Sequence, residues 1–230
     1  MPNFRRYAIY HVPTEPAFFD TGSAWLGWNA RTGKDVAHPA LHGLPAPLSD
    51  ITASPRKYGF HGTVRAPFFL AENTHLADLK SALAVFAATR GPAEVTRLSV
   101  TRVGSFLALT PDGDASTLTA LCGAAVKFVE PFRAPLSAED RARRDPDALS
   151  PRQRHYLDTY GYPYVFEEMR FHITLSGQLE PVHQARVQAI AQAHIFHVLP
   201  QPYRFESLTL LGEDAETRRF HVIQDYPLSG

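Results

Sequence analysis

Residues 58–69 read YGFHGTVRAPFF and place a histidine and a threonine two positions apart in an aromatic and β-branched run. Such a run favours a β-strand, because these side chains pack well on a pleated surface. Successive side chains of a strand point to opposite faces. We therefore expect His61, Thr63 and Arg65 to share one face of this strand, opposite an apolar face that carries Phe60 and Val64.

A second copy of this arrangement occurs at residues 170–176, which read RFHITLS. The same alternation predicts a strand over residues 169–177 with Arg170, His172 and Thr174 on its polar face. A lone histidine in a strand is more often structural than catalytic, but two copies in equivalent elements favour a functional role.

The elements that follow the two motifs also repeat. Each motif precedes one helical pattern and two strand patterns, at residues 73–91, 93–104 and 105–111 in the first half and 180–198, 203–213 and 218–228 in the second. Asn73 or Thr74 is the expected cap of the first helix. This repeat predicts a pseudo-twofold layout in a single bilobed domain, since neither half is expected to fold alone. The first lobe is centred on residues 56–111 and the second on 165–226.

Three other segments lie outside the repeat. Residues 5–13 alternate like a strand, whereas residues 14–55 show no sustained period and are expected to form a long loop, with 23–36 its one compact piece. Residues 114–164 read as a helical insertion between the lobes, with an apolar helix followed by charged helical segments. Its part over residues 131–164 is a candidate lid or rim of the cleft.

Composition limits the class of protein. The 230 residues are 44% hydrophobic and 20% charged, and 23 basic residues balance 23 acidic ones, which argues against binding of long nucleic acid. The single cysteine, Cys122, excludes an internal disulfide framework and suits a reducing compartment. Residues 1–13 lack a secretory pattern and no run approaches a membrane-spanning length. We expect a cytoplasmic protein with no membrane partner.

Two imidazoles that face one cleft suit hydrolysis of a phosphodiester. One neutral ring can take a proton from the attacking oxygen, while the other ring, protonated, donates one to the leaving oxygen. The ordinary histidine pKa of about 6.5 makes both states accessible. Threonine hydroxyls and arginines can bind the non-bridging oxygens, so Thr63, Thr174, Arg65 and Arg170 are candidate substrate-binding residues, and Tyr58 flanks the same groove. No metal ion or cofactor is expected.

The motifs resemble a known family. His61–Val64 and His172–Leu175 are similar to the paired His-x-Thr-hydrophobic signatures of the two-histidine (2H) phosphoesterase superfamily. Four longer segments resemble a branch associated with phosphonate metabolism, namely RYAIYHVP (6–13), WLGWNARTG (25–33), YGFHGTVRAPF (58–68) and RFHITLSG (170–177). The resemblance implies an α+β fold in which two antiparallel sheets line a central groove with helices outside. It also implies metal-independent phosphoesterase chemistry, and our hypothesis is hydrolysis of a small cyclic phosphodiester, such as a ribose cyclic phosphate.

Other interpretations stay open from the sequence. An RNA-end 2′,3′-cyclic phosphodiesterase or 2′-5′ ligase-like enzyme could use the same residues on a short RNA end. A phosphate or nucleotide sensor could use the cleft for binding alone. Pseudo-symmetry does not say which of His61 and His172 is the acid. The pairs His38/His42 and His194/His197 lack a nearby third ligand and are not expected to hold metal.

Overall fold

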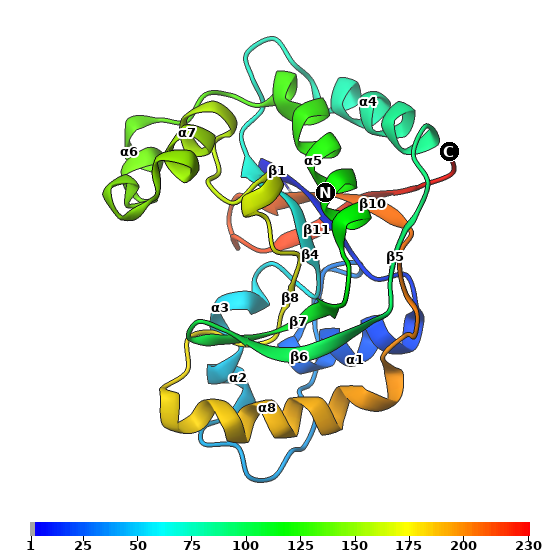
Figure 1. The fold of residues 1–230 in the computed structure, drawn as a ribbon, viewed down its shortest axis with the longest axis vertical. Helices are drawn as coiled ribbons and strands as arrows, with labels where there is room; N and C mark the ends of the chain where they lie inside the picture. Colours follow the sequence, from blue (N-terminus) through cyan, green and yellow to red (C-terminus); the bar gives the residue numbers. More distant parts are fainter. Residues whose placement is uncertain (1–2) are drawn as a thin grey trace.

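Residues 3–230, which the computed structural model describes, form a long antiparallel sheet and two short ribbons. The strands of the long sheet are β1 (Phe4–His11), β4 (Gly62–Phe68), β6 (Arg97–Val103), β7 (Phe106–Asp112), β8 (Ile173–Thr174), β10 (Ser207–Asp214) and β11 (Phe220–Pro227). Their spatial order is β11-β10-β1-β4-β8-β7-β6 (Figure 1). The ribbons pair β2 (Trp28–Asn29) with β3 (Lys34–Asp35) and β5 (Ala93–Val95) with β9 (Tyr203–Phe205). The predicted α+β class with antiparallel pairing is confirmed, and the two expected sheets are joined into one where β4 pairs with β8.

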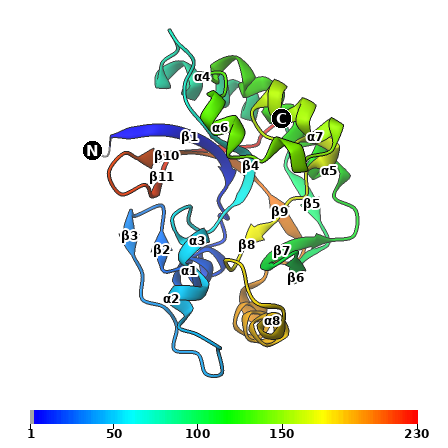
Figure 2. The ribbon, with the colours of Figure 1, turned by 90° about the vertical axis from the view of Figure 1, so that its left-hand side faces the viewer.

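Helices cover the outer sides of this sheet. They are α1 (Pro16–Leu26), α2 (Leu48–Ile51), α3 (Ala53–Arg56), α4 (Leu76–Ala88), α5 (Ser116–Val129), α6 (Ala138–Ala142), α7 (Pro151–Tyr160) and α8 (Pro181–Ile195), with 3-10 turns η1 (Glu130–Phe132), η2 (Pro146–Ala148), η3 (Phe166–Glu168) and η4 (Phe196–Val198). Helices α4 and α5 pack against β10, β11 and β4, whereas α8 packs against β6 and β7 (Figure 2). Each of these helices has fully buried side chains, such as Leu83 of α4, Cys122 of α5 and Val187 of α8. No helix within residues 3–230 is long and apolar enough to cross a membrane.

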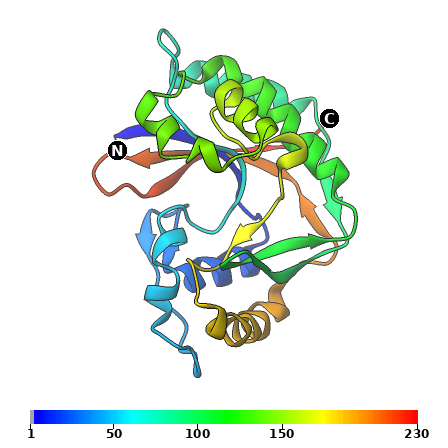
Figure 3. The same cartoon turned by 60° about the vertical axis from the view of Figure 1, so that its left-hand side comes forward.

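The two halves of the sequence exchange their hairpins in space. Hairpin β6–β7 follows β4 along the chain but pairs with β8, and hairpin β10–β11 follows β8 but pairs with β1, the neighbour of β4. The two halves of the sheet meet where Gly62 pairs with Ile173. In Figure 3, β8 (yellow) lies between β7 (green) and the segment of β4 (cyan). The hairpin from each half of the sequence therefore lies beside the motif strand of the other half, or beside its neighbour β1.

The predicted helices and hairpins agree with the structure, except that the strands predicted over residues 93–104 and 203–213 are each divided, at Thr96 and Glu206, and their first parts pair with each other as β5 and β9. Helices α4 and α8 lie within the two predicted ranges, and α8 begins at Pro181 as its sequence suggests. The cap of α4 differs from the prediction, since it is His75, whose backbone N–H donates to the carboxylate of Asp78 at 3.0 Å. Asn73 instead adopts a positive φ of 61°, which ends the preceding turn.

The loop predicted over residues 14–55 is wrong in its first part, where helix α1 forms. Pro16 opens α1, and Gly27 closes it in the left-handed conformation at φ 83°. Small and polar residues dilute its apolar pattern, so the helix was hidden in the sequence. The indole N–H of Trp25 donates to the carbonyl of Leu175 at 2.8 Å and fixes α1 to the segment after β8.

The strand predicted over residues 169–177 is much shorter than expected, because β8 contains two residues. The backbone N–H groups of Leu175 and Ser176 both donate to the carbonyl of Leu107, at 2.8 and 3.3 Å. Two donors on one carbonyl interrupt the regular ladder, so the strand ends at Thr174.

Candidate active site

The pairing of β4 with β8 gathers the repeated motif on one face of the sheet. Gly62 pairs with Ile173 in antiparallel register. Paired residues of antiparallel strands point to the same face, and their immediate neighbours point to the other. When this register is continued by one residue in each direction, each histidine lies opposite the threonine of the other strand. The four side chains on this common face are those of His61, Thr63, His172 and Thr174.

Gly62 lets the two strands approach because it has no side chain. A Cβ atom at this position would lie 2.4 Å from two ring carbons of Phe171. The Phe171 ring occupies the reverse face of the sheet, where it packs near His11 and Phe205 with ring centroids 6.4 and 5.9 Å away. The glycine of the first motif is thus required by packing behind the site.

The first histidine is held in a defined orientation. The Nδ1 atom of His61 lies 2.9 Å from the carbonyl oxygen of Gly59, and its Nε2 atom lies 3.1 Å from the hydroxyl of Thr63. Since a carbonyl only accepts, Nδ1 carries the proton and Nε2 accepts from the threonine. The ring stacks on Tyr10 at a centroid distance of 3.7 Å. Burial lowers the pKa of His61 to about 4, and the charge of His172 acts in the same direction, so His61 is neutral at pH 7.

The second histidine repeats this orientation. The Nδ1 atom of His172 lies 2.8 Å from the carbonyl oxygen of Arg170, again two residues earlier in the chain. The backbone therefore selects the same tautomer, in which Nε2 is available for proton transfer. The ring is half-buried, and its centroid lies 5.7 Å from that of Phe106 on the adjacent strand β7.

Two adjoining pockets of about 180 and 300 Å³ lie at this face and share Tyr58, His61 and Thr174. The smaller pocket also contains Thr63, so it gathers both threonines of the motif and the first histidine. Tyr58, predicted to flank the groove, lines both pockets and stacks on Phe220 at 5.3 Å. The two pockets together form a groove large enough for a small phosphorylated molecule.

Arg65 departs from the predicted face. Thr63 pairs with Tyr10, but Arg65 pairs with Ile9, so two residues of β4 correspond to one step on β1. This bulge turns Arg65 to the other face. The residue is 2% exposed and donates from Nη2 to Glu130 Oε2 at 2.6 Å, outside the pockets that hold His61.

Two other polar residues of the second motif differ in their surroundings. Arg170 is exposed and contributes its carbonyl oxygen to the orientation of His172. The Ser176 hydroxyl accepts from the backbone N–H of Leu107 and donates to the carbonyl of Gly177, at 2.9 and 2.8 Å. Both threonines line the groove, and Ser176 borders its larger pocket, whereas Arg170 lines neither pocket.

Several groove residues had little signal in the sequence. Arg144 and Tyr162 line the smaller pocket, and Phe106 lines the larger one. Arg144 and Tyr162 come from the insertion, so the suggestion that residues 131–164 border the cleft was the one available signal. Phe106 begins β7, and its position depends on the exchanged hairpin.

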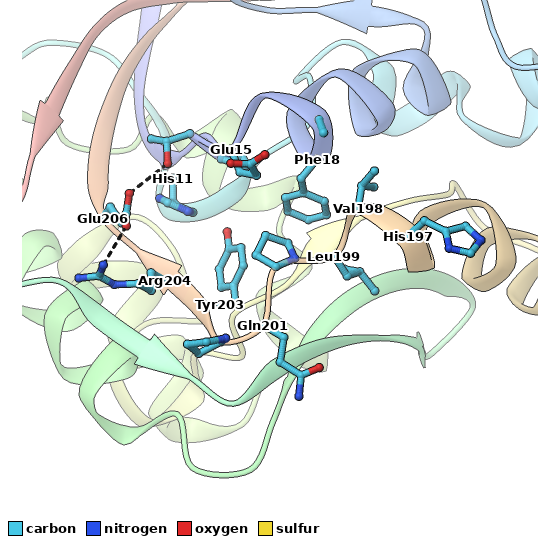
Figure 4. A pocket seen from close by; sticks show the side chains of 15 residues that line it. His11, Glu15, Phe18, His197, Val198, Leu199, Gln201, Tyr203, Arg204 and Glu206 are labelled. Atoms are coloured by element: carbon cyan, nitrogen blue, oxygen red, sulfur yellow. Dashed lines mark hydrogen bonds and ion pairs between the residues drawn. The ribbon is translucent and has the colours of Figure 1, made fainter.

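Another pocket, of about 710 Å³, is lined by His11 and Tyr203 on the opposite face of the sheet (Figure 4). His11 pairs with Gly62, whose neighbours carry the motif, and so it points away from His61. Its Nδ1 atom lies 2.9 Å from the carbonyl oxygen of Ser207, and burial lowers its pKa to about 4. Across residues 3–230, no group of three or more His, Cys, Asp or Glu side chains is arranged to hold a metal ion.

Comparisons with known proteins identify relatives over most of the chain. A family model described as "Protein of unknown function (DUF1045)" matches residues 63–221, a range that includes His172 and begins two residues after His61. The chain is 32% identical over 231 residues to "Ribose 1,5-bisphosphate phosphokinase PhnN" of Janthinobacterium sp. (strain Marseille), covering 98% of this chain and 51% of that protein. It is 35% identical over 218 residues to the protein of the same name from Laribacter hongkongensis (strain HLHK9), covering 94% and 50%. The chain thus spans about half the length of the curated relatives it matches.

Solved structures give more distant matches. TT0787 of Thermus thermophilus has a TM-score of 0.47 at 15% identity, with 98% of both chains covered. LigT of E. coli complexed with 3'-AMP has a TM-score of 0.44 at 12% identity, with 99% of this chain and 100% of that chain covered. At these TM-scores the likeness adds nothing to the fold seen directly in this chain.

Proposed function

Because the chain belongs to the family described as protein of unknown function (DUF1045), whose description assigns no activity, we propose its activity from the site itself. The protein is a metal-independent phosphoesterase that hydrolyses a small cyclic phosphodiester by general acid and base catalysis. The supporting observation is the Gly62–Ile173 pairing, whose register directs two histidines and two threonines to one face. Both histidines present Nε2, because a backbone carbonyl holds each Nδ1.

In this mechanism His61 is the general base. Its pKa, lowered to about 4, keeps the ring neutral at pH 7, so Nε2 can take a proton from a water molecule as its oxygen attacks phosphorus. The Thr63 hydroxyl, which donates to this nitrogen, turns to the phosphate when the water takes its place. His172, the more accessible partner, acts in its protonated form: Nδ1–H stays on the Arg170 carbonyl, and Nε2–H gives its proton to the leaving oxygen when the ring P–O bond breaks. One water is consumed, and the product is a phosphomonoester with a free hydroxyl.

The remaining groove residues bind the substrate in this proposal. Thr63 and Thr174 donate hydroxyl hydrogen bonds to the non-bridging oxygens, on which negative charge grows in the transition state. Tyr58 packs against the organic part of the substrate. Arg65, buried beside Glu130, and Arg170, exposed beyond the pockets, are removed from this contact set.

A phosphorylated ribose is the substrate class we favour. The relatives in Janthinobacterium and Laribacter are named for an enzyme that acts on ribose 1,5-bisphosphate, although this chain spans only half their length. A cyclic phosphate of ribose would fit the groove and the two-histidine chemistry. A reducing, cytoplasmic setting belongs to the same proposal and agrees with the buried free thiol of Cys122.

The test is turnover of a panel of cyclic phosphates by the purified protein in the presence of a chelator. The panel contains ribose 1,2-cyclic phosphate, ribonucleoside 2′,3′-cyclic phosphates and a short RNA with a 2′,3′-cyclic end. His61→Gln and His172→Gln should each lower kcat/KM by about 10²- to 10⁴-fold. His183→Gln, a change on helix α8 outside the groove, is the matched control, and thermal unfolding checks that each variant folds.

Full activity in either motif variant would refute the two-histidine mechanism. Faster turnover of the RNA end than of the ribose compound would favour the RNA-end enzyme. Stoichiometric binding without turnover of any panel member would identify a sensor.

A further inference from the structure

A further pocket, of about 540 Å³, continues the histidine groove at the end of β4. It shares Ala66, Pro67, Arg144 and Tyr162 with the small pocket that holds His61 and Thr174. A single small molecule could therefore occupy both pockets at once. The walls come from the ends of β1 and β4 and from the insertion.

Arginines dominate the lining of this pocket. The five that line it, against one carboxylate from Asp140, are Arg6, Arg65, Arg133, Arg143 and Arg144. The overall charge of the chain is balanced, so this concentration of guanidinium groups is local. Such a surplus attracts anions, and guanidinium groups match phosphate oxygens in geometry.

The buried side chain of Arg65 is the strongest indication that this pocket binds an anion. Although it is 2% exposed, its Nε and Nη1 atoms have no hydrogen-bond partner among residues 3–230. Its Nη2 atom donates to Glu130, and Arg133 takes the other oxygen of the same carboxylate at 2.6 Å. Two buried guanidinium groups thus share one carboxylate. A buried charge with unsatisfied donors is costly unless an anion is present at least part of the time.

Of the other three arginines, Arg143 pairs with Glu139 and Asp140, whereas Arg6 and Arg144 keep positive charge at the pocket. Arg6 donates to Glu213 at 2.5 and 2.9 Å, but Arg218 also binds this carboxylate at 3.0 Å. Arg144 is exposed, and its guanidinium lies 5.1 Å from the centre of the Tyr162 ring, without a carboxylate partner in the described part of the chain. Arg144 lines both pockets and therefore stands between them.

We propose that this arginine pocket binds a second phosphoryl group of the substrate, so that the natural substrate carries a phosphomonoester besides its cyclic phosphodiester. This inference rests on the proposed function for the identity of the first group. The cyclic phosphate lies between the histidines, and the phosphomonoester lies among the arginines. The second group raises affinity and fixes the position of the reacting phosphorus.

The test compares two pairs of methyl riboside probes, which carry no nucleobase. Turnover is measured with methyl riboside 2,3-cyclic phosphate, with and without a 5-phosphate. Binding is measured by calorimetry with methyl riboside 2-phosphate and the corresponding 2,5-bisphosphate. The doubly phosphorylated member of each pair should be preferred by at least about tenfold, the effect of one or two charge-assisted hydrogen bonds.

Two pocket variants and one control test whether the preference for the second phosphate depends on the pocket arginines. Arg6→Gln and Arg144→Gln should reduce it to about threefold or less. Arg141→Gln is the matched control, since Arg141 lies on helix α6, close in the chain to Arg144, but pairs with Asp158 at 2.7 Å. It should keep the full preference. Arg65 is left unchanged because its removal could unfold the protein.

The outcomes separate this inference from the proposed function. Turnover without any preference, or a preference that persists in both pocket variants, would overturn the second phosphate site and leave the phosphoesterase proposal intact. Preferential binding of the bisphosphate without turnover of either cyclic compound would support the site and refute the proposed reaction. Failure of both binding probes to bind would overturn the inference.

Discussion

Replacing Gly62 by alanine should damage the active site from behind. The added methyl carbon would lie 2.4 Å from two carbons of the Phe171 ring, whereas carbon atoms in contact are normally about 3.5–4.0 Å apart. The strain must move the ring or the strands by roughly 1 Å. The ring is 5% exposed and packs near His11 and Phe205, so it has little room to move. We expect β4 and β8 to separate, because they pair at this residue.

The magnitude follows from these distances. Overpacking of this kind costs about 1–3 kcal/mol of unfolding free energy. A shift of about 1 Å between the two histidines should lower kcat/KM by roughly 10²-fold. Urea unfolding and steady-state hydrolysis of the preferred cyclic phosphate measure the two effects.

A second substitution provides the control. Phe171→Leu shortens the ring that the new methyl group meets, so the double variant Gly62→Ala/Phe171→Leu should recover much of the activity. The single variant Phe171→Leu shows what the smaller side chain does alone. An alanine at position 62 that leaves both stability and kcat/KM at parent values would refute the close-approach explanation of this glycine.

Three further predictions concern protonation and anchoring. Since the base form of His61 predominates above its lowered pKa of about 4, the acid limb of kcat/KM should fall near pH 4, and a midpoint at pH 6 or above in the rate profile would contradict this. His11 is fully buried with a pKa lowered to about 4, so the unfolded state binds more protons below pH 6.5. As the pH falls from 6.5 toward 4, this difference in proton binding should lower the unfolding free energy by about 3 kcal/mol, and above pH 6.5 it has no effect. Urea unfolding at pH 7 and 4.5 should therefore show a smaller loss of unfolding free energy for His11→Phe than for the parent. Equal losses would exclude this role. Trp25→Phe removes the donor to the Leu175 carbonyl and should lower the unfolding free energy by about 1–3 kcal/mol, which unchanged urea midpoints would contradict.

Local pattern predicted much of the fold. Helical spacing located α4 and α8, and alternation located the hairpins β6–β7 and β10–β11. These signals need only near neighbours, since side-chain direction repeats every 2 residues in strands and every 3.6 in helices. Helix α1 was missed because its buried Phe18, Trp25 and Leu26 are interspersed with small and polar residues, and it is held by contacts with distant segments.

In the candidate site, too, the sequence predicted one part and the tertiary structure decided the rest. Sequence alone paired His61 with Thr63 and His172 with Thr174, because each pair is separated by one residue within one strand. The tertiary structure decided that β4 and β8 are neighbours, that a bulge turns Arg65 away, and that Arg144 of the insertion reaches the groove. Register and strand order depend on contacts between residues far apart in the chain. A repeating local pattern does not show which distant strand is the partner of lowest free energy, nor where a bulge adds a residue to one strand.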